Sequence, residues 1–263
     1  MTRERSAITR PLFQAKVLSK AFGGVRAVRE ISFDISPCSV FAVIGPNGAG
    51  KSTLLNLMSG IYRPDRGSLV FDGDDVTDTP AYRRVRCGIA RTFQKIRLFR
   101  QLSVLDNVLV GFHVHHRIPF WQYVVHGEAF RRDRRACRDS AADLLQFVGL
   151  AERMQVSAGA LSYGEQRMLE IARALAAKPR LLLIDEPAAG LNAVEVHALL
   201  SRIQNLRKDG VTVVLVEHNM DLVMNVADRI MVMDYGQLLF QGPPSEVQNN
   251  PEVIAAYLGG ELS

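Results

Sequence analysis

Apolar residues follow two different patterns along the chain. Between residues 12 and 35 they recur near every second position, which predicts β-strands joined by a turn at Gly23 and Gly24. Elsewhere they form short continuous runs of strand length, and such runs are typical of strands buried on both faces. We therefore predict further strands at residues 40–44, 68–71, 181–184, 211–216, 230–233 and 238–240.

Longer segments with helical spacing alternate with these runs. Helices are predicted for residues 51–59, 164–177, 194–208 and 251–258. Residues 102–149 differ, because they show little strand pattern and the stretch 131–148 within them has helical spacing. Strands that alternate with helices favour a parallel sheet covered by helices. The expected fold class is therefore α/β, with a helical subdomain inserted into the core.

Composition places the chain among ordinary globular proteins. Its 263 residues are 48% hydrophobic and 22% charged, which is enough apolar material for a sizeable core. The net charge of +5 and the pI of about 9.3 are compatible with anionic partners such as nucleotides. No apolar stretch has the length of a membrane span, and we see no secretory signal. The three scattered cysteines fit free thiols, so we expect a cytoplasmic protein.

A glycine-rich loop follows the apolar run at residues 40–44. It satisfies the pattern G-x-x-x-x-G-K-[ST] and leads into a predicted helix, which disfavours a glycine-rich turn that matches by chance. The loop consists of Gly45, Pro46, Asn47, Gly48, Ala49, Gly50, Lys51 and Ser52, and Thr53 comes next. Glycines let backbone N–H groups wrap a phosphate. Lys51 would contact the β- and γ-phosphates of a nucleotide, and the hydroxyl of Ser52 would bind Mg²⁺.

A second candidate element ends the apolar run at residues 181–184. Two carboxylates, Asp185 and Glu186, follow this run directly. Ligands of open parallel sheets bind at the carboxyl ends of strands, so both acids are expected near the phosphate loop. We assign Asp185 to Mg²⁺, through its water shell, and Glu186 to polarising an attacking water. Taken alone, the pair could equally cap a helix before Pro187.

With both motifs in place, the chain resembles the ATP-binding subunits of ABC transporters over nearly its whole length. The segment 161–166, Leu-Ser-Tyr-Gly-Glu-Gln, resembles the family signature LSGGQ and departs from it at Tyr163. The D-loop position holds Asn192 in place of the more common aspartate. The resemblance implies ATP and Mg²⁺ as cofactors. It also implies that Phe22 stacks on adenine, that Gln94 of the Q-loop binds Mg²⁺, and that His218 is the switch histidine.

The resemblance further implies the domain organisation. Residues 1–263 would form a single ABC nucleotide-binding domain. It would have a P-loop NTPase core with a mixed, mainly parallel sheet, an N-terminal antiparallel β subdomain and an inserted α-helical subdomain. Residues 12–93 and 178–263 would form the α/β core, and residues 94–177 the helical subdomain with the signature loop.

The family mechanism implies the partners. Two subunits pair head to tail, and each ATP lies between the phosphate loop of one subunit and the signature of the other. Ser162, Gly164 and Glu165 would therefore bind nucleotide held by a second ATP-binding subunit, which is a paralogue or another copy. The catalytic residues implied are Glu186, His218 and Gln94. Two transmembrane permease subunits and, indirectly, an extracytoplasmic substrate-binding protein complete the expected assembly, without nucleic acid. The chain would lie peripherally on the inner face of the cell membrane.

Three segments favour one subgroup of the family. Residues 91–99, 186–192 and 249–259 are similar to the ATPases of branched-chain amino-acid importers. The resemblance thus implies ATP hydrolysis that energises uptake of branched-chain or other hydrophobic amino acids. The alternatives are another ABC system, for lipopolysaccharide-type export or urea and amide uptake, or a soluble ABC ATPase of DNA repair or translation. A kinase or GTPase on the same loop is disfavoured, because the guanine motif N-K-x-D is absent.

Other features receive no functional assignment. His113, His115 and His116 cannot all share one helical face, so packed or solvated histidines are favoured over a metal site. The basic run at residues 131–138 is typical of a solvated helix face, with attraction to anionic lipid as the alternative. Trp121 is expected to pack against the helical insert.

Overall fold

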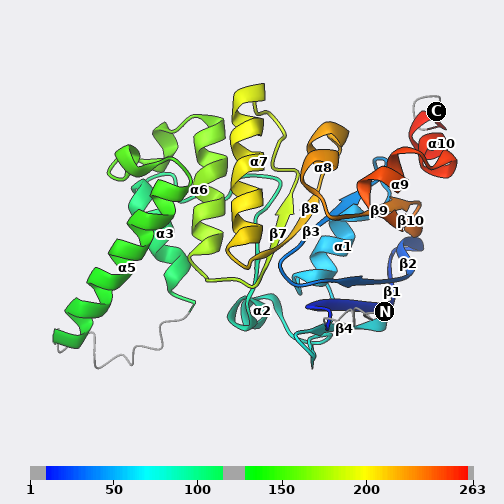
Figure 1. Cartoon of the computed structure of the whole chain (residues 1–263). Coiled ribbons are helices and arrows are strands. Elements are labelled where there is room, and N and C mark those ends of the chain that lie inside the picture. The colour runs from blue at the N-terminus through cyan, green and yellow to red at the C-terminus, as the bar shows by residue number, and fades with distance from the viewer. Residues whose placement is uncertain (1–9, 115–127, 260–263) are drawn as a thin grey trace, which may run out of the picture.

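A computed structural model describes residues 10–114 and 128–259 of the chain. The strands form two sheets, and a group of helices lies to one side of the larger sheet (Figure 1). The smaller sheet is antiparallel and has the strand order β2-β1-β4-β5. Its strands are β1 (Phe13–Phe22), β2 (Val25–Ile35), β4 (Arg66–Phe71) and β5 (Asp74–Asp75).

The larger sheet is mixed and mainly parallel, with the strand order β10-β9-β3-β8-β7-β6. β10 pairs antiparallel with β9, and the other neighbours in this order run parallel. β3 therefore lies in the interior of the sheet, between strands that come much later in the chain. The strands are β3 (Val40–Ile44), β6 (Ile89–Arg91), β7 (Leu181–Asp185), β8 (Thr212–Val216), β9 (Arg229–Asp234) and β10 (Gln237–Gly242).

β3, β7 and β8 are buried along their whole length because both faces of the larger sheet are covered. Alternate residues of β7 belong to different hydrophobic cores. Leu182 and Ile184 pack with the helices on one face. Leu181 and Leu183 pack on the other face with the antiparallel sheet and α1 (Lys51–Met58). This double burial explains why the sequence shows continuous apolar runs at these strands.

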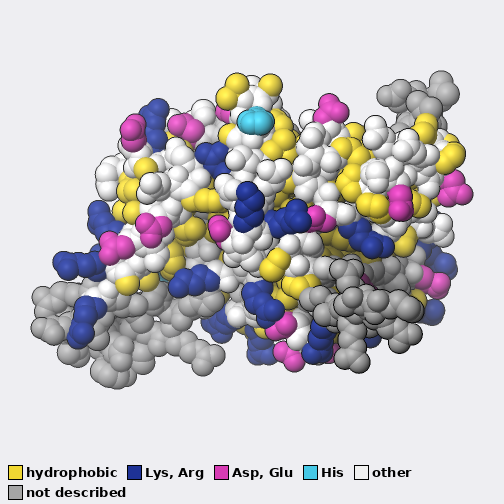
Figure 2. Space-filling model, viewed as in Figure 1, with side chains coloured by type: hydrophobic (Ala, Val, Ile, Leu, Met, Phe, Trp, Pro, Cys, Tyr) yellow, Lys and Arg dark blue, Asp and Glu magenta, His cyan; other side chains and the backbone are white. Residues whose placement is uncertain are grey.

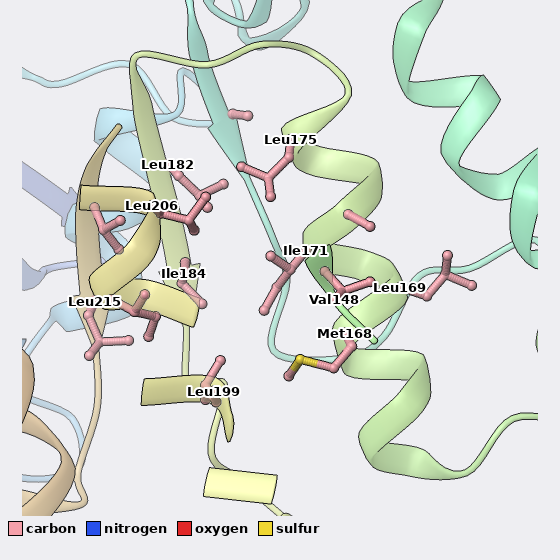
Figure 3. Close-up of a cluster of buried hydrophobic side chains, with 14 of the residues drawn as sticks. Val148, Met168, Leu169, Ile171, Leu175, Leu182, Ile184, Leu199, Leu206 and Leu215 are labelled. Carbon is pink, nitrogen blue, oxygen red and sulfur yellow. The ribbon is translucent and has the colours of Figure 1, made fainter. Parts of the chain in front are cut away.

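The inserted region is helical and is joined to the sheet by its last helix. It contains α3 (Val104–Phe112), α5 (Glu128–Phe147) and α6 (Tyr163–Leu175), with short 3-10 helices at Ala151–Arg153 and Ala158–Ala160. Figure 3 shows Ile171 and Leu175 of α6 pointing toward β7, whereas Leu169 points to the opposite side of the helix. All three side chains are buried. α6 therefore packs against the core and the rest of the insert at once.

The remaining helices are α2 (Ala81–Cys87), α7 (Ala193–Lys208), α8 (Met220–Val226), α9 (Pro244–Gln248) and α10 (Pro251–Gly259). α2 is anchored by Arg84, whose buried guanidinium donates to the carbonyl oxygens of Leu57 (2.6 Å) and Met58 (2.8 Å) at the end of α1. The last carbonyls of a helix lack partners in a following turn, and Arg84 supplies donors to two of them. The Leu57 oxygen also accepts from the backbone N–H of Gly60 (3.2 Å). Burial lowers the pKa of Arg84 to about 10.

The predicted fold class is confirmed, with an antiparallel sheet, a mixed and mainly parallel sheet, and a helical insert. The four predicted helices correspond to α1, α6, α7 and α10. Periodicity missed β5, β6, α2, α8 and α9, all of which are short. Among the described residues no helix is long and apolar enough to cross a membrane. Charged side chains of both signs are interspersed on the face shown in Figure 2.

Candidate functional site

Three strand ends meet at one edge of the larger sheet. Val216, the last residue of β8, pairs with Val43 of β3 on one side and with Asp185 of β7 on the other. The phosphate loop after β3, the two carboxylates at the end of β7 and His218 after β8 therefore emerge side by side. This is the edge at which ligands bind in open parallel sheets. Sequence order and strand pairing together bring these residues into one place.

The glycines of the phosphate loop are required by its backbone. Gly45 has φ 147° and Gly50 has φ 97°, which lie in the left-handed region that favours glycine. A Cβ atom added at Gly45 would overlap the backbone oxygen of Met233, and one added at Gly50 would overlap that of Ala27. Both obstacles are backbone atoms of neighbouring segments. The loop can therefore approach these segments only because it lacks side chains at these positions.

Lys51 lies folded over the loop that precedes it. Its Nζ donates to the backbone oxygens of Gly45 (2.6 Å) and Pro46 (2.8 Å). Burial lowers the pKa of Lys51, and the negative charges of Glu186 and Asp185 oppose this shift. The ammonium group is thus placed between the loop and the acidic pair. Gly50 is the N-cap of α1, so Ser52 and Thr53 belong to the first turn of that helix, and the Ser52 side chain is exposed.

Asp185 forms a buried ion pair with Arg91 of β6. Nη2 of Arg91 lies 2.9 Å from Oδ2 of Asp185, and Nη1 of Arg91 donates to Oδ1 of Asn56 (2.6 Å). Burial raises the pKa of Asp185, and the adjacent positive charge of Arg91 opposes the shift. Within the described part of the chain, the other carboxylate oxygen, Oδ1, is buried without a hydrogen-bond partner. A buried acceptor of this kind fits a water ligand of Mg²⁺.

Glu186 is held by the residue predicted for the Q-loop. Nε2 of Gln94 donates to Oε2 of Glu186 at 2.8 Å, although the two residues are 92 positions apart. The backbone of Glu186 has φ 45°, and its N–H donates to the carbonyl oxygen of Val216 (2.9 Å). A non-glycine residue in the left-handed region is strained, and such strain is common at functional sites. The two residues therefore form one hydrogen-bonded unit beside Asp185.

His218 projects from the end of β8 with its side chain 63% exposed. Its neighbour Glu217, by contrast, is fully buried and accepts from the backbone N–H groups of Ala188 (2.8 Å) and His218 (3.1 Å). Nδ1 of His218 lies 3.9 Å from Oε2 of Glu217. Glu217 thus ties the segment after Glu186 to the segment that contains His218. Glu217 belongs to no predicted site, although an acid between a buried strand and a candidate histidine was a usable signal in the sequence.

Phe22, the residue predicted to stack on adenine, is 41% exposed at the end of β1. The ring of Tyr62 meets it edge-on at a centroid distance of 5.1 Å. Nζ of Lys20 lies 5.4 Å from the centroid of the Phe22 ring and is paired with Asp65 at 2.7 Å. An exposed aromatic ring with fixed neighbours is a suitable surface for a planar base. Tyr62 could not be predicted from the sequence, because no motif includes it.

The predicted signature loop lies at the start of α6. Ser162 is the N-cap, its Oγ accepts from the N–H of Glu165 (3.2 Å), and Oε2 of Glu165 accepts from the N–H of Ser162 (2.8 Å). This reciprocal capping box fixes the loop as a helix start. Gly164 is buried against the carboxylate of Glu195 in α7, whereas Tyr163 is 46% exposed. In Figure 1, α6 and α1 lie on opposite sides of β7, so one chain presents two separate loops.

The remaining candidates give no further site. His115, His116 and Trp121 lie outside the described residues. Among the described residues, no group of three His, Cys, Asp or Glu side chains could hold a metal ion. Ser52, Gln94 and Asp185 stay the residues predicted for Mg²⁺, and the unpartnered Oδ1 of Asp185 is the observation that fits this prediction. Chemically, the residues at this edge of the larger sheet can hold a phosphate chain, balance its negative charge and orient a water molecule beside Glu186.

Comparisons with known proteins cover almost the whole chain. The model of the ABC transporter family matches residues 28–189. A second family model, described as branched-chain amino acid ATP-binding cassette transporter, matches residues 237–262. The first match includes the phosphate loop, the signature segment and the carboxylates at the end of β7, and the second begins at β10.

Two curated relatives and one solved structure illustrate the similarity. The high-affinity branched-chain amino acid transport ATP-binding protein BraF of Pseudomonas aeruginosa is 42% identical over 96% of this chain and 99% of its own length. LivG of Escherichia coli, which has the same description, is 40% identical over the same shares. An ATP-binding cassette of an ABC transporter in its ADP conformation superimposes with a TM-score of 0.83 and 29% identity, over 95% of this chain and 100% of that one.

Proposed function

The chain belongs to the ABC transporter ATP-binding family, and we propose that it binds and hydrolyses ATP to energise uptake of branched-chain or other hydrophobic amino acids. The main observation behind this proposal is the convergence of three strand ends at one edge of the sheet. The phosphate loop, Asp185 and the hydrogen-bonded pair of Gln94 and Glu186 all lie there. The similarity to BraF and LivG extends over both the catalytic region and the C-terminal segment, which supports the amino-acid importer subgroup.

The roles proposed at the catalytic edge follow from its contacts. The loop N–H groups and Lys51 would bind the phosphates, because they combine a helix N-terminus with a buried positive charge. Ser52, Gln94 and Asp185 would hold Mg²⁺, which neutralises charge on the β- and γ-phosphates. Glu186, oriented by Gln94, would accept a hydrogen bond from the attacking water and align it. We assign His218, exposed at the same edge, to contact with the terminal phosphate.

We infer the partners from the two nucleotide-binding loops, each of which needs the complementary loop of a second subunit. The helices that follow the signature loop and the phosphate loop, α6 and α1, lie on opposite sides of β7 (Figure 1), so a second ATP-binding subunit would bring a signature loop to this nucleotide. That subunit would be a paralogue or another copy. Two membrane permeases would dock near Phe99, whose side chain is 52% exposed shortly after the Q-loop. A substrate-binding protein outside the membrane would deliver the amino acid. The chain would thus lie on the inner face of the membrane.

Two substitutions test the catalytic assignment. Glu186→Gln should bind MgATP normally and hydrolyse it about 100- to 1,000-fold more slowly, since the carboxylate that aligns water is lost. Lys51→Ala should instead weaken MgATP binding, because the phosphates lose a positive charge. Equilibrium titration with MgATP and steady-state phosphate release separate the two effects. Glu152→Gln, at an exposed acid after α5, is the matched control and should behave like the wild type.

The cargo is tested in the assembled transporter. Uptake of radiolabelled leucine, by cells that contain the cognate permeases, should stop in Glu186→Gln and continue in Glu152→Gln. Unimpaired ATP turnover in Glu186→Gln would remove this residue from the catalytic role. Normal turnover without uptake of any branched-chain amino acid would retain the ATPase and reject the cargo.

A further inference from the structure

Arg167, on the second turn of α6, is a fully buried charged residue that the proposed mechanism does not use. Its Nη1 donates to the backbone oxygen of Phe93 at 2.8 Å, and its Nη2 donates to that of Gln94 at 3.0 Å. Nη1 also pairs with Oε2 of Glu170 at 3.1 Å. A guanidinium can bind several acceptors in a fixed plane, so Arg167 holds this piece of backbone in a defined orientation.

Glu170 holds the same segment through its amides. Its Oε1 accepts from the backbone N–H of Phe93 and of Arg97, both at 3.4 Å. Residues 92–98 form neither helix nor strand, so their conformation depends on such contacts. Burial raises the pKa of Glu170, and the charge of Arg167 opposes this shift. A buried ion pair contributes little stability by itself. Here the pair fixes the backbone of the segment that carries Gln94.

Tyr163 connects this pair to the signature loop. It lies one turn before Arg167 on α6, and Nη2 of Arg167 donates to its hydroxyl at 3.2 Å. The ring of Tyr163 also faces the segment that follows Glu186, since a Cβ atom added at Gly190 would lie 3.1 Å from Cε1 of that ring. The family signature has glycine at this position, and glycine has no hydroxyl. The departure from LSGGQ therefore adds a contact that the usual sequence cannot make.

We propose that Tyr163, acting through Arg167, is a positioning residue for Gln94 and thereby for Glu186. The connection runs from the hydroxyl of Tyr163 to Arg167, from Arg167 to the backbone of Gln94, and from the Gln94 amide to the carboxylate of Glu186. It links the loop that faces a partner subunit to the water-aligning group of the same chain. This inference rests on the proposed ATPase function, and it concerns coupling rather than nucleotide contact by the signature loop.

Tyr163→Phe is the sharpest test, because it keeps the ring against Gly190 and removes only the hydroxyl. We expect kcat for ATP hydrolysis to fall about three- to tenfold while KM for ATP is unchanged, since one hydrogen bond to a charged donor is lost away from the nucleotide. Tyr82→Phe is the matched control: its exposed side chain lies on α2, and its hydroxyl takes no part in these contacts. The control should keep the wild-type kcat and KM.

Hydrogen exchange supplies a second readout that does not require turnover. Peptides covering residues 92–98 should exchange faster in Tyr163→Phe than in Tyr82→Phe, because the Arg167–Glu170 pair protects the amides of Phe93 and Arg97 less well. Melting curves should show that both variants remain folded at the temperature of the assay.

Three results would overturn the proposal. The first is a Tyr163→Phe variant that matches the control in both kcat and exchange. The second is faster exchange with unchanged kcat, which would make the contact merely structural. The third is a raised KM at constant kcat, which would mean direct nucleotide binding by Tyr163. A wild-type protein that hydrolyses no ATP would instead reject the proposed function, and the exchange comparison would still decide whether the connection exists.

Discussion

The loops that begin α1 and α6 both contain glycine, but different obstacles surround them. In the phosphate loop, side chains at Gly45 and Gly50 would overlap backbone oxygens. In the signature loop, the three atoms nearest to a Cβ added at Gly164 all belong to the carboxylate of Glu195. The position before it holds Tyr163, which is half-exposed and has room for a ring. Space for a side chain is therefore excluded where the obstacle is backbone, and it is easier to obtain where the obstacle is a side chain or solvent.

The charged groups of the two regions are also used differently. At the phosphate loop, Asp185 keeps one buried carboxylate oxygen without a partner in the described part of the chain. Nζ of Lys51 donates to two loop carbonyls, and the negative charges of Glu186 and Asp185 act to raise its pKa. Around α6, Arg167 and Glu170 pair with each other, and both also form hydrogen bonds with the backbone of residues 93–97. The first set is available to a ligand, whereas the second set fixes a loop. This difference separates a binding region from a positioning region.

The largest effect is expected at the phosphate loop. Gly50→Ala should weaken MgATP binding more than about 100-fold, because a left-handed alanine costs about 1–2 kcal/mol and the loop must also move away from the Ala27 oxygen. Calorimetric titration with MgATP measures the loss, and circular dichroism verifies that the variant is folded.

Gly48→Ala is the matched control for this prediction. Gly48 has φ 80° but nothing lies within 4 Å of an added Cβ, so only the conformational cost of about 1–2 kcal/mol applies. Its effect on binding should be clearly smaller than that of Gly50→Ala. Equal losses of MgATP affinity in the two variants would show that the positive φ alone, and not the nearby backbone oxygen, makes glycine necessary in this loop.

Local sequence patterns identified the strands and helices that are long enough, or buried enough, to show a distinctive spacing of apolar residues. The apolar runs of β3, β7 and β8 reflect burial on both faces, and the spacing of α6 and α7 is long enough to be recognised. β6 has three residues and α8 has seven, which is too short for periodicity to be distinctive. These elements form because neighbouring strands and helices already provide their partners.

The candidate site also contains a part that the sequence predicts and a part that it does not. The alternation of strands and helices predicts a parallel sheet, and this was sufficient to expect the phosphate loop and the two carboxylates at one edge of it. The ion pair of Arg91 with Asp185 and the contact of Gln94 with Glu186 join residues more than 90 positions apart. No periodicity encodes such pairings. Arg167 and Tyr62 belong to no motif, so only the folded arrangement assigns them neighbours.

A smaller effect is expected from Gly164→Ala in the signature loop. The added methyl would displace the Glu195 carboxylate, which accepts from the N–H of Asn192 (2.9 Å) in the capping box of α7. Loss of such a cap costs about 1 kcal/mol, while alanine in place of glycine favours a helix by about 1 kcal/mol. The net change in the free energy of unfolding should therefore be below about 1 kcal/mol. Denaturant titration measures it.

The two opposing contributions of Gly164→Ala can be separated by introducing it into the Glu195→Ala variant. Without the carboxylate, Gly164→Ala should stabilise the protein by about 0.5–1 kcal/mol, because only the helical preference remains. A double-mutant cycle gives the coupling between the two positions. Absence of coupling would mean that Glu195 is not the obstacle, and the proposed contrast with the phosphate loop would fail.

The smallest effect is expected from Asn192→Asp, which reverses the other departure from the family pattern. Oδ1 of Asn192 accepts from the N–H of Glu195 at 3.0 Å, which makes Asn192 the N-cap of α7. Aspartate is as good an N-cap as asparagine, and its charge gains about 0.3–1 kcal/mol at a helix N-terminus. The nearby carboxylate of Glu195 offsets part of this gain. Asn192→Asp should therefore change the free energy of unfolding by less than about 0.5 kcal/mol, whereas Asn192→Ala should lower it by about 1 kcal/mol. Denaturant midpoints of both variants decide the matter. If Asn192→Asp lowered the free energy of unfolding as much as Asn192→Ala, the amide N–H₂ group of Asn192 would itself contribute to stability. The region around the signature loop would then tolerate fewer substitutions than its contacts indicate.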